Sequence, residues 1–116
     1  MKLLGLIAGT SFQKERSLDD MAEKRIENEF GAVQVLFAEG FVYIPRHGKG
    51  YHNEIPPHMI NHKANLKAMK DLGVEDIISV NSTGSLKKEL KPGTLIVPDD
   101  YISVSETPTI FDNEQR

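Results

Sequence analysis

The residues best suited to chemistry lie in a basic, glycine-containing stretch, Pro45 to His52, which reads Pro-Arg-His-Gly-Lys-Gly-Tyr-His. Arg46 and His47 are adjacent in it, and the stretch directly follows an apolar run, Phe41 to Ile44. A guanidinium offers several N–H donors in a planar fork and an imidazole adds another, so the pair is suited to holding an oxyanion such as phosphate or carboxylate. The alternative is an ordinary basic surface loop, which has the same composition.

Two further polar turns also follow apolar runs. Gly9-Thr10-Ser11 comes after Leu3 to Ala8, and Asn81-Ser82-Thr83-Gly84-Ser85 comes after Val74 to Val80. Ligands of α/β proteins bind beyond the carboxyl ends of strands, so the three turns would meet at one edge if their strands are neighbours in one sheet. Hydroxyls, backbone amides and one guanidinium would then form a site of phosphate size. Alternatively, the hydroxyls of the first turn only cap a helix or close the turn.

Two histidines have the spacing of metal ligands. His58 and His62 lie four residues apart, so that they would share one face of a helix. No acidic residue or third ligand stands at a useful spacing, and the chain has no cysteine. A polar helix face is therefore the preferred interpretation, and no metal site is expected. The lack of cysteine also excludes a disulfide framework, a thiolate zinc site and a cysteine nucleophile.

The elements that must position these residues follow from the apolar pattern. Short apolar runs between turn residues predict buried strands, whereas spacings of three and four predict helices. Strands are predicted at 3–8, 41–44, 74–80 and 94–97, together with a hairpin that starts near Arg25, turns at Gly31 and continues through 33–37. Helices are predicted as a short segment from Ser17, as a long segment from Pro56-Pro57 to Leu72 with Gly73 as its cap, and as one turn at 86–90. The strand–helix–strand order around the long helix predicts a parallel crossover in an α/β fold.

Composition and charge exclude several classes of protein. A chain of 116 residues with an ordinary composition fits one globular domain with a moderate core. A formal net charge of −3 argues against a general nucleic-acid or membrane-surface binder, because either would carry a basic excess. The apolar start, Met1 to Ala8, is too short to span a bilayer and is not followed by a signal-peptide cleavage pattern. A cytoplasmic enzyme or binding domain, without nucleic-acid or membrane partners, is expected.

In combination, the motifs resemble those of the methylthioadenosine phosphorylases, which belong to the trimeric purine nucleoside phosphorylase group. The resemblance runs from about Leu3 to Asp112 and rests on several elements in a fixed order. These are Leu6-Ile7-Ala8-Gly9-Thr10, Pro45-Arg46-His47-Gly48, Pro56-Pro57-His58 with Asn61 and Ala64-Asn65, Gly84-Ser85-Leu86, and Leu90-Lys91-Pro92-Gly93. It implies an α/β fold with a central mixed β-sheet of the phosphorylase type, flanked by helices, of which this chain would be the first half.

The resemblance also implies a reaction. In phosphorolysis, inorganic phosphate displaces a purine from C1′ of a nucleoside and leaves the free base and a sugar 1-phosphate. 5′-Methylthioadenosine is the expected nucleoside, and inosine, guanosine or adenosine are the alternatives. Phosphate is a co-substrate, so no cofactor is expected, and no residue is assigned as catalytic. The resemblance implies phosphate contacts for Thr10, Arg46, His47, Asn81 and Ser82, substrate contacts for Asn81, Ser82, Thr83 and Gly84, and a homotrimer.

The chain departs from the family pattern in several features, among them the segment from His47 to Pro56, which is about two residues longer than usual and leaves His52 without an assigned role. The first turn reads Ala8-Gly9-Thr10-Ser11 where the family usually has glycine–glycine–Ser/Thr–glycine. Family members are also much longer, and their base-selecting acidic residue and much of their sugar site lie in the second half. Residues 1–116 are therefore interpreted as the N-terminal portion of a single phosphorylase domain, with the missing C-terminal half as a partner. The alternative is a non-catalytic half-domain that binds phosphate or a nucleotide.

Overall fold

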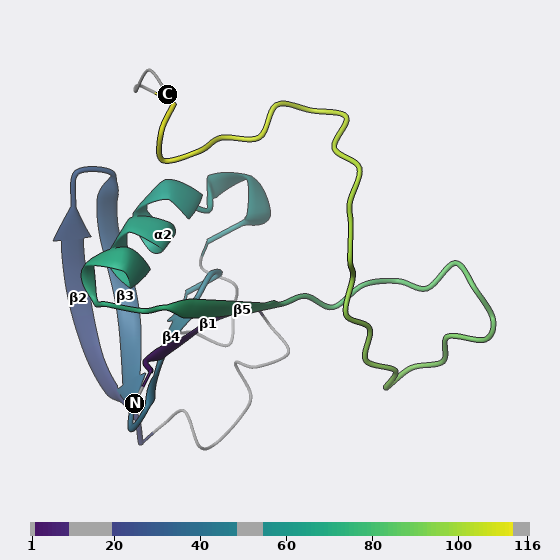
Figure 1. Ribbon diagram of the computed structural model, residues 1–116, viewed down its shortest axis with the longest axis horizontal. Helices are drawn as coiled ribbons and strands as arrows, with labels where there is room; N and C mark the ends of the chain where they lie inside the picture. The colour runs from purple at the N-terminus through teal and green to yellow at the C-terminus, as the bar shows by residue number, and fades with distance from the viewer. Residues whose placement is uncertain (1, 10–19, 49–54, 113–116) are drawn as a thin grey trace. The chain divides into compact units, whose positions relative to one another are not determined.

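The computed structural model describes residues 2–9, 20–48 and 55–112, which belong to two compact units, Met1–Asn81 and Ser82–Arg116. Every helix and strand of the described residues lies in the first unit. Their order along the chain is β1 (Leu4–Ala8), β2 (Ala22–Asn28), β3 (Gly31–Ala38), β4 (Phe41–Pro45), the 3-10 helix η2 (Pro57–Met59), α2 (His62–Asp71) and β5 (Asp76–Val80) (Figure 1).

The five strands form one mixed sheet in the order β2-β3-β4-β1-β5. The strands β2, β3 and β4 are antiparallel neighbours, whereas β1 is parallel to both β4 and β5. After β4 the chain passes through α2 and returns as β5 on the far side of β1. The predicted mixed α/β sheet and its parallel crossover are therefore confirmed, and the carboxyl ends of β1, β4 and β5 lie along one edge.

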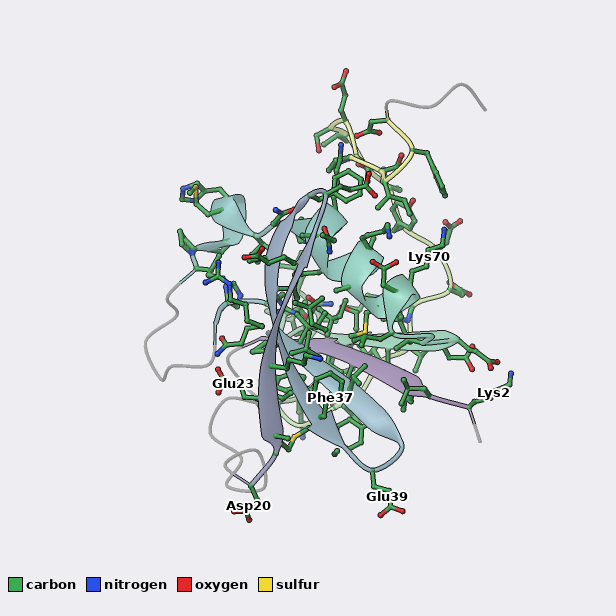
Figure 2. All side chains as sticks on the ribbon, turned by 90° about the vertical axis from the view of Figure 1, so that its left-hand side faces the viewer. Lys2, Asp20, Glu23, Phe37, Glu39 and Lys70 are labelled. Carbon is green, nitrogen blue, oxygen red and sulfur yellow. The ribbon has the colours of Figure 1, made fainter. Side chains whose placement is uncertain are left out.

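Apolar side chains are buried on both faces of the sheet. On the face covered by α2, four strand residues pack against the small residues and the methionine of the helix: Val33, Val35, Val42, Ile44, Ala64, Ala68 and Met69. On the opposite face, Ala8, Leu36 and Tyr43 form a second buried cluster. Figure 2 places Phe37 among the side chains of the sheet and Glu23 and Glu39 at its periphery. Burying a large apolar side chain stabilises a fold by about 1.5–3 kcal/mol, so these two clusters dominate the stability of the first unit.

Two asparagines hold α2 against the β2–β3 hairpin. Asn61 caps the helix, because its side-chain oxygen accepts from the Ala64 N–H at 3.1 Å, and its Nδ2 donates to the Phe30 carbonyl at 2.7 Å. The side chain of Asn28 donates from Nδ2 to the Ala64 carbonyl at 3.0 Å and accepts from the Phe30 N–H at 2.9 Å. The hairpin turn and the first turn of the helix are thus joined by a closed set of hydrogen bonds, and this fixes where α2 lies over the sheet.

The hairpin is confirmed, but its first strand starts earlier than expected. The predicted short helix begins in the masked range 10–19, outside the described residues, and where its pattern reaches Ala22 the structure has strand β2. Ala22 pairs with Phe37 and Lys24 with Val35, and the side chain of Gln34 donates to that of Glu23. Pairing with β3 therefore overrides the helical spacing of a short, polar segment.

The long helix is in fact two elements. The 3-10 turn η2 ends at Met59, Ile60 and Asn61 leave helical geometry, and α2 begins at His62. The division arises because Asn61 acts as an N-cap, which requires a non-helical backbone at that residue. Leu66, an apolar residue of α2, is 42% exposed. Gly73 is confirmed as the C-terminal cap, since it has φ 80° and donates to the Lys70 carbonyl at 3.0 Å.

The second unit has little regular structure in the part that the structure describes, residues 82–112. The tight turn at Pro92-Gly93 is confirmed by the Thr94 N–H, which donates to the Lys91 carbonyl at 3.1 Å. One hydrogen-bonded turn from Lys87 to Leu90 stands where a helical turn was expected. The strand predicted at 94–97 is wrong: these residues pair with no strand among the described residues, and Leu95 and Val97 are each 93% exposed. No helix among the described residues has the length and apolar character needed to cross a membrane.

Removing the cap at Asn61 should loosen α2. In Asn61→Ala the Ala64 N–H loses its acceptor and the Phe30 carbonyl loses its donor, so the free energy of unfolding in urea should fall by about 1–2 kcal/mol. Asn61→Asp retains the capping oxygen and removes only the donor, so its loss should be smaller. An alanine variant as stable as the unchanged chain would contradict the proposed role of this residue.

The buried Tyr43 should make stability fall in alkaline solution. Its side chain is 1% exposed, and burial raises the pKa of the phenol above 10.0, while the nearby Arg46 guanidinium acts in the opposite direction. A raised pKa in the folded chain means that this stabilisation is complete below the unfolded pKa and is lost as the pH rises through the folded value. Urea unfolding between about pH 9 and 11 should show this loss, and Tyr43→Phe should remove that part of the pH dependence. Tyr101→Phe, at a residue that is 81% exposed, should leave it unchanged.

Candidate functional site

The candidate site is built around Arg46, the residue directly after β4. Its backbone N–H donates to the Ala8 carbonyl at 3.1 Å, so the pairing of β4 with β1 extends one residue beyond the strand. Its side chain is half-buried, and Nη1 donates to the carbonyl of Val80, the last residue of β5, at 2.8 Å. Because β1 lies between β4 and β5, the guanidinium crosses the carboxyl end of β1 and joins the three parallel strands.

The crossing passes directly over Gly9. A Cβ atom at this residue would lie 2.6 Å from Nη2 of Arg46 and 3.0 Å from its Cζ, which is closer than non-bonded atoms approach. The same atom would lie 3.2 Å from Cδ2 of His47. The side chains of Arg46 and His47 therefore both lie close to the backbone at the end of β1.

His47 is anchored to the start of the segment that leads into η2. Its ring nitrogen Nδ1 lies 2.8 Å from the Ile55 carbonyl, and the Ile55 N–H donates to the His47 carbonyl at 2.9 Å. A carbonyl oxygen can only accept, so Nδ1 carries the hydrogen and Nε2 is the nitrogen left for a ligand. Gly48 has φ 91° and donates to the Pro45 carbonyl at 3.0 Å, which closes the turn that carries the pair.

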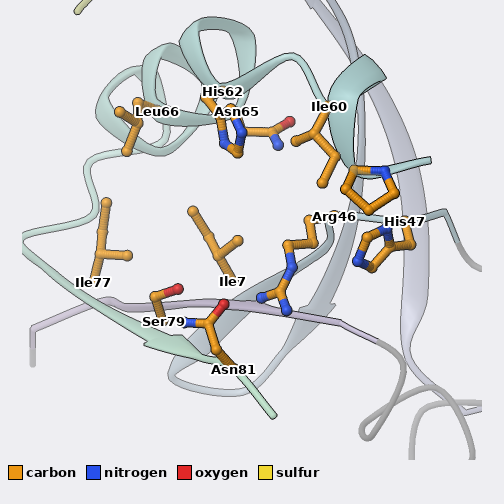
Figure 3. Close-up of a pocket in the computed structure, with 11 residues that line it drawn as sticks. Ile7, Arg46, His47, Ile60, His62, Asn65, Leu66, Ile77, Ser79 and Asn81 are labelled. Carbon is orange, nitrogen blue, oxygen red and sulfur yellow. The ribbon is translucent and has the colours of Figure 1, made fainter. Parts of the chain in front are cut away.

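A pocket of about 520 Å³ opens on the face of the sheet that α2 covers. Figure 3 shows Arg46 and His47 at one side of it, Ile7 and Ser79 on the sheet, and His62 and Leu66 on the helix opposite. The described residues that line it are Ile7, Arg46, His47, Pro57, Ile60, His62, Asn65, Leu66, Ile77, Ser79 and Asn81. Arg46, His47 and Asn81 lie where β4 and β5 end, His62 and Asn65 face them from α2, and apolar side chains from β1, β5 and α2 line the rest.

The polar side of the pocket is suited to an anion. The described residues that line it include no carboxylate, so the positive charge of Arg46 has no acidic partner within the lining. Of the five N–H donors of this guanidinium, one is used by Val80 in the described part of the chain. The remaining donors, the imidazole of His47 and the amide of Asn81 offer charge-assisted hydrogen bonds to one oxyanion.

The structure brings part of the predicted site together. Arg46, His47 and Asn81 line one pocket at the carboxyl ends of β4 and β5. Thr10 lies outside the described residues. Ser82, Thr83 and Gly84 belong to the second unit, so their part in the site stays a prediction, as do the binding roles of the first three residues.

The sequence alone did not reveal two features of the site. The carbonyl of Val80 holds Arg46, but a backbone acceptor has no side-chain signal in a sequence. Gly9 was assigned to a hydroxyl-bearing turn, whereas the structure gives its missing side chain a steric role. A glycine directly after a buried parallel strand, in a chain with an arginine after the neighbouring strand, is the signal that would have pointed to it.

Comparison with known proteins identifies the family of this chain. The model of the phosphorylase superfamily matches residues 4–116. The S-methyl-5′-thioadenosine phosphorylase of Thermofilum pendens is 35% identical over 109 residues, which are 89% of this chain and 41% of that protein. The probable S-methyl-5′-thioinosine phosphorylase of Methanocaldococcus jannaschii is 38% identical over 104 residues, 90% of this chain and 40% of that protein.

Solved structures agree with the sequence relatives. The methylthioadenosine phosphorylase of Schistosoma mansoni in complex with adenine superposes with a TM-score of 0.67 at 32% identity, covering 80% of this chain and 35% of that one. The chain thus spans about 40% of the length of the curated relatives that it matches. With the mixed sheet, the ordered motifs and a family match over nearly all its residues, this chain belongs to the phosphorylase superfamily.

Proposed function

We propose that this chain is the phosphate-binding part of a purine nucleoside phosphorylase that acts on 5′-methylthioadenosine. In the reaction a phosphate oxygen forms a bond to C1′ as the bond from C1′ to the purine breaks, which gives adenine and a sugar 1-phosphate. The observation that carries the proposal is the Arg46 guanidinium, held over the end of β1 by Val80 beside His47 and Asn81. An anion placed there lies beyond the carboxyl ends of three parallel strands, where α/β proteins bind ligands.

The proposed chemistry requires positioning and charge rather than a covalent enzyme intermediate. As the bond to the purine breaks, C1′ gains the character of an oxocarbenium ion, and a phosphate dianion fixed beside it stabilises that positive charge and is also the nucleophile. Arg46 would hold the dianion through its free N–H groups. The hydrogen bond to Val80 keeps the fork from rotating, which lowers the entropy lost on binding.

The remainder of the phosphorylase domain is the proposed partner. Strand β5 is an edge strand among the described residues, and its side chains at Ile77 and Ile78, on opposite faces, are 42% and 50% exposed. An exposed apolar edge strand favours pairing with a further strand and cover on both faces. The second half, which would also select the base, would supply both. The trimer that the family resemblance implies and the cytoplasmic location expected from the sequence are part of the same proposal.

The identity of the purine has a second candidate. Relatives include a probable 6-oxopurine nucleoside phosphorylase of Thermococcus kodakarensis, 33% identical over 121 residues, and a purine nucleoside phosphorylase of Streptomyces coelicolor, 36% identical over 117 residues. Inosine, guanosine or adenosine is therefore the alternative substrate. A half-domain that binds phosphate without catalysis is the alternative from another class.

The assay for this function measures purine release that depends on phosphate. The chain is incubated with 5′-methylthioadenosine, inosine, guanosine or adenosine, alone and together with a co-expressed C-terminal phosphorylase segment. We expect adenine from 5′-methylthioadenosine only when phosphate and the second segment are both present. Release of a purine from inosine instead would favour the second candidate substrate, and phosphate binding without release would favour the non-catalytic half-domain. If the chain shows no phosphate binding and no purine release, the proposal is refuted.

Two arginine variants provide the control for this assay. Arg46→Ala removes a charged donor fork, so phosphate should bind about 10- to 100-fold more weakly by calorimetry, and release should fall at limiting phosphate. Arg25→Ala removes an arginine of the same charge from β2, where its side chain is 74% exposed and faces Glu27. Its phosphate affinity should equal that of the unchanged chain.

Two substitutions should distinguish the roles of the two ring nitrogens of His47. Asn places its amide nitrogen near the position of Nδ1, whereas Gln reaches the position of Nε2. His47→Asn should therefore keep the donor to Ile55 and lose the contact with phosphate, and phosphate affinity should fall about 10-fold. His47→Gln should retain more of that affinity and should lower the melting temperature, because Ile55 loses its donor. A His47→Asn variant with the affinity of the unchanged chain would exclude a role for Nε2.

A further inference from the structure

We propose that Gly9 is a positioning residue, whose missing side chain leaves the channel through which the Arg46 guanidinium crosses β1 to reach Val80. The distances define this channel closely: a Cβ at residue 9 would approach Nη2 to 2.6 Å and Cζ to 3.0 Å. The consequence for phosphate rests on the function proposed above, whereas the steric coupling between Gly9 and Arg46 does not.

The direction of residue 9 follows from the sheet. Side chains alternate along a strand, so residues 5, 7 and 9 face α2, and residue 8 faces the opposite side. The methyl group of Ala8 is fully buried there against Leu36 and Tyr43. A side chain is therefore accepted at residue 8 and excluded at residue 9, only one position along the strand.

Packing around the guanidinium, rather than the backbone conformation, explains why glycine occupies residue 9. The structure assigns left-handed φ angles to Gly31, Gly40, Gly48, Gly73 and Gly93, and Gly9 is not among them. Alanine therefore fits the backbone at residue 9 without strain. The atoms that its methyl group would meet first belong to the end of a flexible arginine side chain. The chain should thus remain folded in Gly9→Ala, with the guanidinium moved away from Val80.

This displacement would change what phosphate meets. When the bond to Val80 is intact, the guanidinium is restrained at the pocket that it lines with His47 and Asn81, and no other described residue uses its remaining N–H groups. Once that bond is lost, Arg46 keeps its charge but must be ordered by the ligand, and this weakens binding. Gly9 thus acts on phosphate through Arg46, without a side chain of its own.

The first test is a binding cycle with inorganic phosphate, measured by calorimetry on the chain. Gly9→Ala should bind phosphate about 10-fold more weakly, comparable with the loss of one charged hydrogen bond. In the Arg46→Ala background the two closest atoms are absent and the methyl group meets only Cδ2 of His47, at 3.2 Å, so Gly9→Ala should cause little further weakening. Affinity unchanged in the single variant, or a tenfold loss repeated in the double variant, would overturn the proposal.

Gly5→Ala is the matched control, because Gly5 lies on the same strand and the same face. A Cβ there would meet Met69 Sδ at 2.8 Å and Val74 Cγ1 at 2.9 Å, in the core and away from Arg46. This variant should melt at a lower temperature but bind phosphate as the unchanged chain does. Equal losses of phosphate affinity in Gly5→Ala and Gly9→Ala would mean that a general disturbance of β1 is responsible.

The second test does not depend on phosphate. Gly9→Ala should lower the melting temperature of the otherwise unchanged chain, because the Arg46 hydrogen bond to Val80 is lost, and should not lower it in the Arg46→Ala background. Equal decreases in both backgrounds would refute the steric coupling. If the unchanged chain binds no phosphate, the proposed function fails, and this cycle still decides whether Gly9 positions Arg46.

Discussion

The hydrogen bond from Arg46 to the Val80 carbonyl is the interaction on which the site depends. It spans three strands, because the arginine leaves β4, passes the end of β1 and reaches β5 at 2.8 Å. This contact restrains a long, cationic side chain, while no other described residue uses its remaining donors. A lysine could supply the charge but not the planar fork, since its three donors share one nitrogen and a hydrogen bond to the carbonyl would leave two of them rather than four.

This contact requires the order of the strands. If β5 had followed β4 directly in the sheet, the arginine would not pass over β1, and the residue after β1 could carry a side chain. The crossover through α2 instead leaves β1 in the centre, with parallel neighbours on both sides. The hydrogen bonds of Asn28 to Ala64 and of Asn61 to Phe30 fix the helix that makes this crossover. Topology, the helix cap and the steric demand on Gly9 are therefore parts of one arrangement.

The sequence predicted the parts of this arrangement that depend on local pattern. Apolar runs identified β1, β4 and β5, and the adjacent arginine and histidine identified the polar turn. The break at Asn61 was missed although its cap, the Ala64 N–H, lies only three residues on, because the apolar spacing continues from Ile60 to Ala64 across it. The second contact of this side chain, from Nδ2 to the Phe30 carbonyl 31 residues earlier, has no signal in the sequence. The extent of β2 was missed because Ala22 to Lys24 gain their structure from pairing with β3 rather than from their own preference. The pattern at 94–97 could not form a strand by itself, since a strand needs a neighbour to pair with.

The proposed reaction needs two tasks, binding of phosphate and selection of the purine, and they place different demands on the chain. Arg46 and His47 are held by backbone carbonyls and Asn81 directly follows β5, so these three residues of the proposed oxyanion site all belong to the first unit. Selection among purines requires donors and acceptors that match the edge of a base, and beside these three residues the described lining offers His62, Asn65 and Ser79 as polar groups among isoleucine, leucine and proline. Under the proposed function, phosphate affinity would therefore vary independently of the base. Relatives with different purines in their names are consistent with this, since they share the part of the chain that would bind phosphate.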